Sequence, residues 1–127
     1  MRPVPTVLFV DDEPEVTRAL QRSLRAEPFR ILVADSAEDA LRIMARESVD
    51  VLITDESMPG TRGSEMLART RKTHPNVTTM VLTGHAAHES KIQDLAEGNI
   101  QRFLAKPCDA GQIASAIHEA LRERDHK

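Results

Sequence analysis

A chain of 127 residues is long enough for one domain with a single buried core. Its 17 basic and 20 acidic residues give a net charge of −3, and no run of Lys or Arg is long enough to follow a nucleic-acid backbone, which argues against direct nucleic-acid binding. The single cysteine cannot form an internal disulfide, and no apolar stretch approaches the roughly 20 residues that cross a bilayer. We expect one cytoplasmic domain over residues 1–127, with a core of about 6–123, short solvated tails and no membrane segment.

The predicted elements alternate between strands and helices. Apolar runs rich in β-branched residues predict strands, and apolar residues at helical spacing predict helices. In chain order these are a strand at 6–10, a helical face within 16–24, a strand at 30–34, a helical face within 37–45, a strand at 49–54, a helix at 64–73, a strand at 77–83, a helix at 86–97, a strand at 101–105 and a helical face within 113–121. Ser36 and Asp109 are candidate N-caps for the helices that follow them.

Five strands alternating with five helices predict an α/β fold, with a parallel sheet covered on both faces by right-handed crossovers. The second and fifth strands are less apolar than the others, as edge strands would be. In open sheets of this kind, ligands bind beyond the carboxyl ends of the strands. The strand ends are therefore where functional residues are expected.

Charged and hydroxyl side chains stand at four of these ends. Asp11 and Asp12 follow the first strand, Asp55 follows the third, Thr83 ends the fourth and Lys106 follows the fifth. If the first and third strands are neighbours, three carboxylates meet, and they repel one another unless a cation lies among them. Oxygen ligands suit Mg²⁺ or Mn²⁺ better than zinc. The alternative is that Asp11 or Asp12 only caps the helix that follows.

The same residues suit phosphoryl transfer. A carboxylate such as Asp55 can attack phosphorus and form an aspartyl phosphate. Lys106 and a cation would offset charge on the transferring oxygens, and the Thr83 hydroxyl would donate to one of them. Gly84 leaves room for the phosphoryl group beside the backbone.

Four motifs carry a resemblance to a known family: "FVDDEP" (9–14), "DESMPGTRG" (55–63), "LTG" (82–84) and "FLAKP" (103–107). In this order and at these spacings the chain resembles the receiver domains of two-component response regulators over essentially all of residues 6–123. The resemblance implies a flavodoxin-like (βα)5 three-layer sandwich, with the five parallel strands in the order 2-1-3-4-5.

The resemblance also implies a role for each site residue. Asp55 would be the phosphoacceptor, and Asp11 and Asp12 would hold Mg²⁺ together with Asp55 and the backbone carbonyl of Ser57. Thr83 would move toward the phosphoryl group and Lys106 would pair with it. Phe103 would be the aromatic switch that turns inward when Thr83 moves, although most phenylalanines at such a position are simply core. Pro59 and Gly63 would shape the loop beside the site, and the bond from Lys106 to Pro107 would be cis.

The function implied is a phosphorylation-operated switch rather than an enzyme with an external substrate. A sensor histidine kinase or a histidine phosphotransfer protein would supply the phosphoryl group in a Mg²⁺-dependent step. The surface of the fourth helix, fifth strand and fifth helix would then change its binding to an effector or its dimerisation. A weaker likeness to receivers ahead of HD-GYP-type phosphodiesterases suggests one such effector.

Two other functions compete with this one. A haloacid-dehalogenase-like phosphatase also forms an aspartyl phosphate, but it needs a second Asp two residues after the nucleophile, where this chain has Ser57. A pseudo-receiver would keep the fold and bind a ligand without phosphorylation. Among the remaining residues, His85 is large enough to hinder the water that hydrolyses the phosphoryl group. His85 with His88 supplies too few ligands for zinc, and Cys108 is expected to be a partly buried small residue.

Overall fold

The protein is described here from a computed structural model, which covers residues 4–84 and 88–125. The elements follow one another as β1 (Thr6–Val10), α1 (Pro14–Ser23), β2 (Arg30–Ala34), α2 (Ala37–Arg46), β3 (Val51–Asp55), α3 (Gly63–Thr73), β4 (Thr78–Thr83), α4 (Glu89–Leu95), β5 (Arg102–Ala105) and α5 (Ala110–Asp125). No helix in the described ranges combines the length and the apolar character that crossing a bilayer requires.

All five strands are parallel and lie in the order β2-β1-β3-β4-β5, so the predicted α/β fold and strand order are confirmed. The three central strands are buried along their whole length, whereas β2 and β5 are partly exposed. This explains why the second and fifth strands are less apolar in sequence, because an edge strand has fewer neighbours to cover it.

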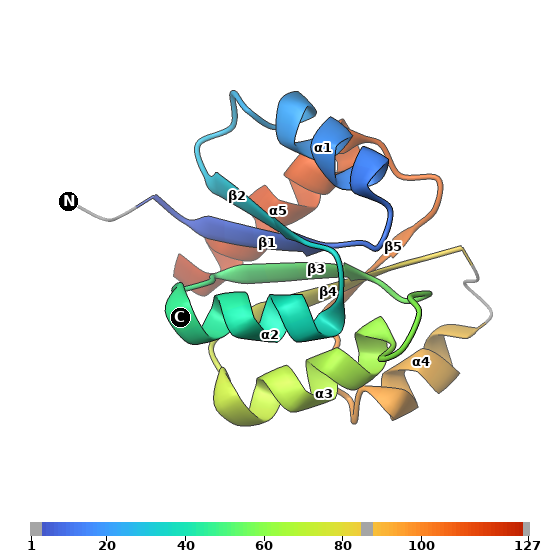
Figure 1. The fold of residues 1–127 in the computed structure, drawn as a ribbon. Helices are drawn as coiled ribbons and strands as arrows, with labels where there is room; N and C mark the ends of the chain where they lie inside the picture. Colours follow the sequence, from blue (N-terminus) through green and yellow to red (C-terminus); the bar gives the residue numbers. More distant parts are fainter. Residues whose placement is uncertain (1–3, 85–87, 126–127) are drawn as a thin grey trace.

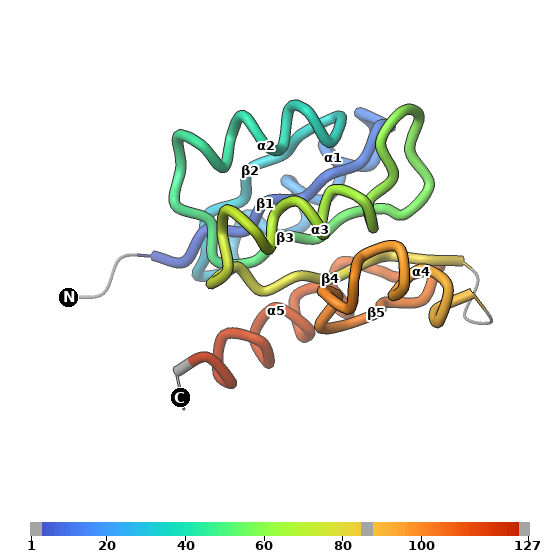
Figure 2. Tube along the Cα trace, turned by 90° about the horizontal axis from the view of Figure 1, so that it is seen from below, coloured from blue at the N-terminus to red at the C-terminus, as the bar shows by residue number. Residues whose placement is uncertain are grey.

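The helices form two layers, one on each face of the sheet (Figure 1). Successive side chains of a strand point to opposite faces. Accordingly Val7 and Phe9 of β1 pack in a core with residues of α1 and α5, while Leu8 and Val10 pack in a second core with residues of α2, α3 and α4. Seen from below, α2, α3 and α4 lie in front of the sheet and α1 lies behind it (Figure 2).

Helix ends follow local capping chemistry. The Ser36 hydroxyl accepts the Asp39 N–H at 3.1 Å at the start of α2. Asp109 accepts the Gln112 N–H at 2.8 Å through its carboxylate, and the Gln112 side chain accepts the Asp109 N–H at 2.8 Å. Both predicted N-caps are thus confirmed, and the second is a reciprocal pair that fixes the start of α5.

Several predicted boundaries differ from the observed ones, and two of the differences have a local cause. The third strand begins at Val51 rather than at residue 49, because the carboxylate of Asp50, and not a backbone carbonyl, accepts the Thr6 N–H at 2.8 Å. The fourth helix ends at Leu95 rather than at residue 97, because Glu97 and Gly98 have positive φ angles of 56° and 76°. Its predicted start, at residue 86, lies outside the described residues.

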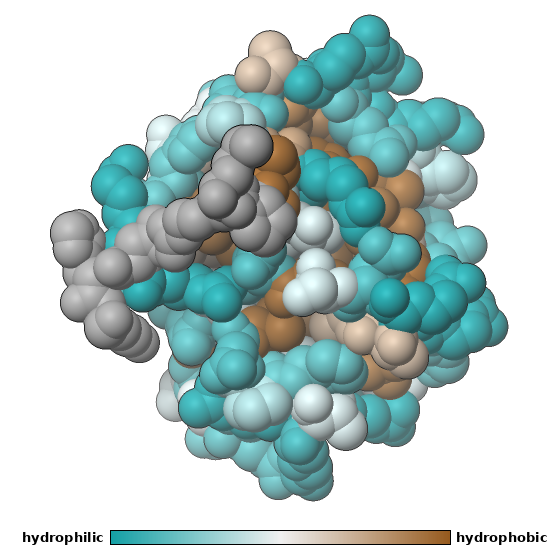
Figure 3. Space-filling model, turned by 90° about the vertical axis from the view of Figure 1, so that its left-hand side faces the viewer, coloured by the Kyte–Doolittle hydropathy of each residue, from teal (hydrophilic) through white to brown (hydrophobic). Residues whose placement is uncertain are grey.

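The amino ends of the strands form the side of the molecule opposite the strand ends considered above. The face there is mostly hydrophilic, with small hydrophobic areas visible between the polar residues (Figure 3). Arg124 near the end of α5 donates to the backbone carbonyl of Asp50 at 2.9 Å and lies 3.3 Å from its carboxylate. The last turn of α5 is thereby held against the start of β3.

Candidate functional site

Strand register brings the predicted acidic residues together. Val10 of β1 pairs with Thr54 of β3. The residues that follow them, Asp11 and Asp55, therefore emerge side by side at the carboxyl edge of the sheet, and Asp12 comes next along the chain. The neighbouring position of the first and third strands, on which the predicted cluster depended, is confirmed.

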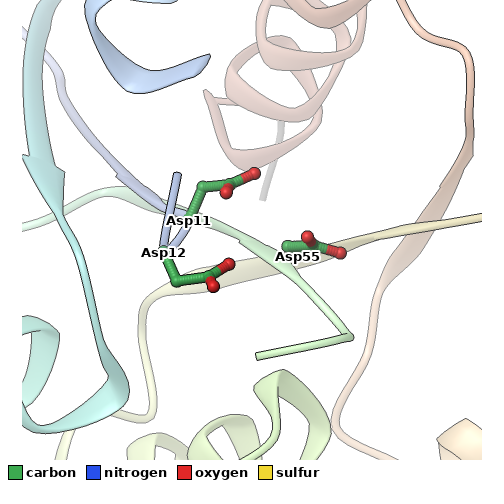
Figure 4. A group of neighbouring side chains, drawn as sticks. All are labelled: Asp11, Asp12 and Asp55. Carbon is green, nitrogen blue, oxygen red and sulfur yellow. The ribbon is translucent and has the colours of Figure 1, made fainter. Parts of the chain in front are cut away.

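The three carboxylates face a common space (Figure 4), and each offers an oxygen within 4.8 Å of the other two. Asp11 and Asp55 are buried, each with 4% of its surface exposed, and Asp12 is more exposed. An all-oxygen set of this charge and spacing fits a hard divalent cation such as Mg²⁺. Within residues 4–84 and 88–125, no other group of three His, Cys, Asp or Glu side chains comes as close together.

Asp11 shows the electrostatic cost of this cluster. Burial raises the pKa of its carboxyl above the usual 3.8, and the charges of Asp55 and Asp12 raise it further. The Glu13 N–H, which donates to Asp11 at 2.9 Å, and the Lys106 ammonium act in the opposite direction without cancelling the rise. The fold therefore holds Asp11 where its ionised form is disfavoured, and a bound cation would favour that ionised form.

The alternative in which Asp11 or Asp12 caps the first helix is wrong. The N-cap of α1 is Glu13, which makes no side-chain capping bond, and Pro14 occupies the first turn. Asp11 instead accepts the N–H of Glu13, one residue before the helix begins. Proline at this position needs no capping partner, since it has no N–H. Neither aspartate therefore caps α1, and both lie at the carboxyl edge of the sheet.

Lys106 completes the charged part of the site. Its ammonium donates to Asp55 Oδ1 at 2.9 Å, and 42% of its side chain is exposed. Its backbone N–H donates to the carbonyl of Thr83 at 2.9 Å, which joins the ends of β4 and β5. The peptide bond to Pro107 is cis, as the resemblance implied.

An open cavity of about 670 Å³ adjoins Asp55. Thr83 and Lys106 line it, together with residues of the loop after β3 and of α4. Thr83 is buried, with 5% of its surface exposed, and a side chain at Gly84 would have open space around it. The cavity has room for a tetrahedral anion attached to Asp55, within reach of a hydroxyl and an ammonium.

The loop between β3 and α3 passes beside the carboxylates. The Ser57 N–H donates to Asp55 Oδ1 at 3.3 Å, and Pro59 lines the cavity. Gly63 is packed so tightly that a Cβ there would lie 2.4 Å from the carbonyl oxygen of Asp55. This lack of space for a side chain explains why residue 63 is a glycine. The part assigned to the Ser57 carbonyl in holding a metal stays a prediction.

The remaining predicted residues lie around this centre. Phe103 is half-buried against the core on the α2, α3 and α4 face, and its partner in β4 is Val81. Its switching role stays a prediction. Cys108 is half-buried, and burial together with the charge of Asp109 raises the pKa of its thiol, which lowers its reactivity. His88 is exposed, and the prediction for His85 falls outside the described residues.

Sequence reasoning did not single out Glu56, the neighbour of Asp55. It has only 8% of its surface exposed, and its two carboxylate oxygens accept the N–H and the hydroxyl of Ser64 at 2.7 and 2.8 Å. The available signal was an acid between a buried strand and the start of a helix. Because acids are common in such loops, that signal does not identify a partner.

Comparison with known proteins agrees with this geometry. The family model described as "Response regulator receiver domain" matches residues 7–118. The hydrogenase transcriptional regulatory protein HoxA of Cupriavidus necator is 34% identical over 116 residues, which are 91% of this chain but 24% of HoxA. The chain thus spans about a quarter of the length of this relative.

Solved structures give the same result. The signal receiver domain of an HD domain-containing protein from Pseudomonas fluorescens superimposes with a TM-score of 0.87 at 30% identity, covering 99% of this chain and 93% of that one. The response regulator protein TrrA of Thermotoga maritima, solved in complex with Mg²⁺-BeF, has a TM-score of 0.80 at 26% identity, with 91% and 98% covered. These matches do not favour the phosphatase or the pseudo-receiver. The chain belongs to the response regulator receiver domain family of two-component signalling.

Proposed function

We propose that this receiver domain works as a switch by accepting a phosphoryl group on Asp55 in a Mg²⁺-dependent step. The observation that carries the proposal is the meeting of three carboxylates with the Lys106 ammonium, which lies 2.9 Å from Asp55, beside an open cavity. A relative solved with Mg²⁺-BeF supports the choice of metal. Besides these side chains, the reaction needs Mg²⁺ and a phosphoryl donor.

The positions of these side chains support the following reaction. An oxygen of Asp55 attacks the phosphorus of a phosphohistidine, the P–N bond breaks, and its electron pair stays on the imidazole nitrogen. Asp11, Asp12, Asp55 and the Ser57 carbonyl would hold Mg²⁺, which supplies positive charge to the transferring oxygens. Lys106 would offset the remaining charge on the transferring oxygens, and the Thr83 hydroxyl would donate a hydrogen bond to one of them.

The output would arise on the surface of α4, β5 and α5. Register pairs Val81 with Phe103 and Thr83 with Ala105, so a shift of Thr83 acts directly on the strand that carries Phe103. Two discrete positions of Phe103 would give the surface two states, and phosphorylation would change their populations. In this reading the domain assists its own phosphorylation and dephosphorylation and has no external substrate.

The partners proposed are a cytoplasmic histidine kinase domain or a histidine phosphotransfer protein as donor, and an effector domain or protein as recipient of the signal. The likeness to the receiver of an HD domain-containing protein supports an HD-GYP-type phosphodiesterase as one effector. The likeness to HoxA supports a transcriptional regulator as another. Dimerisation through the switch surface is a further output.

The test is the intact mass of the protein after incubation with Mg²⁺ and acetyl phosphate. We expect one added phosphoryl group in the wild type and none in Asp55→Asn or after addition of EDTA. Ser57→Ala serves as a matched control, because it changes the loop side chain but keeps the backbone carbonyl. Absence of the adduct in the wild type, with both acetyl phosphate and a phosphorylated histidine kinase as donors, would contradict the proposal.

A further inference from the structure

Glu56 is a buried acid whose position is fixed by the end of the sheet. It follows Asp55 directly and has 8% of its surface exposed. Its backbone N–H donates to the carbonyl of Leu82 at 3.2 Å, which is the hydrogen bond that closes the last β3–β4 pair, Asp55 with Leu82. An acid is rarely buried without partners, since the desolvation of a charge is costly. Its partners therefore indicate why it is there.

Both partners belong to one residue at the start of α3. The Ser64 N–H donates to Glu56 Oε1 at 2.7 Å, and the Ser64 hydroxyl donates to Oε2 at 2.8 Å. Ser64 is completely buried. The preceding N-cap, Arg62, supplies no side-chain hydrogen bond, so an orphan N–H of the first helical turn is satisfied by Glu56 instead.

Glu56 connects the two ends of the loop of residues 57–62. Glu56 precedes the loop, and its carbonyl accepts the N–H of Gly63 at 3.3 Å, directly after the loop. Gly63 in turn lies against the carbonyl of Asp55. The first loop residue, Ser57, donates its N–H to the Asp55 carboxylate. Loosening the start of α3 would therefore loosen both Ser57 and Asp55.

We propose that Glu56 is a positioning residue for the metal site: by its two hydrogen bonds to Ser64 it holds the 57–62 loop where Ser57 and Asp55 can bind Mg²⁺ together. This inference rests on the proposed function, because it assumes that the site binds Mg²⁺. Glu56 acts through hydrogen-bond geometry rather than through its charge, since both of its oxygens are engaged by Ser64. It touches neither the metal nor the phosphoryl group.

Substitutions can separate geometry from charge. Glu56→Gln keeps both hydrogen bonds, because the amide oxygen accepts the Ser64 N–H and the amide nitrogen donates to the Ser64 hydroxyl, but it removes the charge. Glu56→Ala removes both bonds and the charge. Ser64→Ala removes one bond and keeps the charge, and it serves as a milder variant if Glu56→Ala fails to fold. Glu65→Ala is the matched control, since it removes an exposed acid from the same helical turn.

Two readouts are needed, the Mg²⁺ dissociation constant by NMR titration and the hydrogen exchange of the loop amides in EDTA. In Glu56→Ala we expect Mg²⁺ binding about tenfold weaker, the lower end of the loss seen when residues that hold metal ligands are changed. Exchange of the amides at 57–62 should be faster, while Ser64→Ala should show a smaller effect in both. Glu56→Gln and Glu65→Ala should match the wild type in both.

The outcomes distinguish this inference from the proposed function. Mg²⁺ binding and loop exchange in Glu56→Ala equal to those of the wild type would overturn the inference and leave the function intact. Equal weakening in Glu56→Gln and Glu56→Ala would overturn it in favour of charge. If the wild type itself bound no Mg²⁺, the proposed function and this metal-positioning role would both fail, whatever the exchange rates showed.

Discussion

Lys106 and Asp55 are 51 residues apart in the chain and belong to β-strand ends separated by the whole of β4, yet they form an ion pair of 2.9 Å. The pair crosses the end of β4 beside Thr83. It offsets part of the negative charge that Asp55 shares with Asp11 and Asp12. The ammonium is thus in place before any phosphoryl group arrives, which avoids reorganisation during transfer.

Lys106→Met should slow phosphorylation by acetyl phosphate by about 100-fold, the loss typical when a charge-stabilising donor is removed from an active site. Met keeps most of the apolar length of the side chain, so the fold should be little affected. The rate is measured by intact mass against time. Lys91→Met is the matched control, because Lys91 lines the same cavity from α4, whereas the ion pair to Asp55 is made by Lys106. An unchanged rate in Lys106→Met would show that the ion pair has no part in transfer.

Mg²⁺ should stabilise the folded protein. A ligand that binds only the native state at 100 times its dissociation constant raises the free energy of unfolding by about 2.7 kcal/mol. Asp12→Asn should lose most of this gain, and Glu13→Gln, which changes the neighbouring exposed acid, should keep it. The melting temperature with Mg²⁺ and with EDTA provides the measurement, followed by circular dichroism because the chain has no Trp or Tyr. Equal gains in Asp12→Asn and the wild type would exclude Asp12 as a ligand.

Asp11→Asn should stabilise the metal-free protein at neutral pH. The pKa of Asp11 is raised in the folded state and returns to about its usual value on unfolding, so the folded state binds more protons between these two pKa values. The wild-type free energy of unfolding therefore decreases as the pH rises through this window. Asn removes that loss and can still accept the Glu13 N–H.

The advantage of Asp11→Asn should be fully present above the folded pKa of Asp11 and should vanish well below pH 3.8, where the carboxyl is protonated in both states. Urea denaturation in EDTA at several pH values measures it. Glu15→Gln, a change at an exposed acid on α1, should show no such dependence. A loss of stability in Asp11→Asn at pH 7 would mean that its hydrogen bonding outweighs its repulsion.

Gly63→Ala should destabilise the fold by about 1–3 kcal/mol, the usual cost of inserting a methyl group into a packed interior. The new Cβ would lie 2.4 Å from the carbonyl oxygen of Asp55 and 2.9 Å from Cγ2 of Thr54, and a backbone oxygen cannot move aside cheaply. Gly84→Ala provides the control, because a Cβ there meets nothing within 4 Å. Urea denaturation measures the free energy of unfolding of both variants. Equal losses in Gly63→Ala and Gly84→Ala would refute the steric explanation.

The sequence predicted the elements well where one physical effect dominated. The central strands are buried on both faces, so their apolar β-branched runs clearly indicate strands. The alternation of these strands with helices indicates a parallel sheet. The start of β3 was misplaced because the side chain of Asp50 replaces a backbone acceptor there, which no periodicity reveals. The early end of α4 depends on the left-handed Glu97, a conformation that a non-glycine residue rarely adopts.

Some residues of the candidate site could be predicted from the sequence and others could not. Asp11, Asp12 and Asp55 could be found from the sequence because strand ends are few and the repulsion among carboxylates requires a reason. Glu56 could not, since its importance depends on contact with Ser64, eight residues further along, and on the burial of both. The contacts between Glu56 and Ser64 depend on how α3 is placed against the end of the sheet, which the sequence pattern does not reveal.

The pairing of Val10 with Thr54 links assembly of the site to fidelity of folding. A slip of β1 by one residue against β3 would carry Asp11 past Asp55 and would also turn Leu8 and Val10 away from α2, α3 and α4. A chain that paired its strands wrongly would lose both its cores and its carboxylate cluster at once. We therefore expect a chain with this register slip to lack the carboxylate cluster on which the proposed phosphorylation depends.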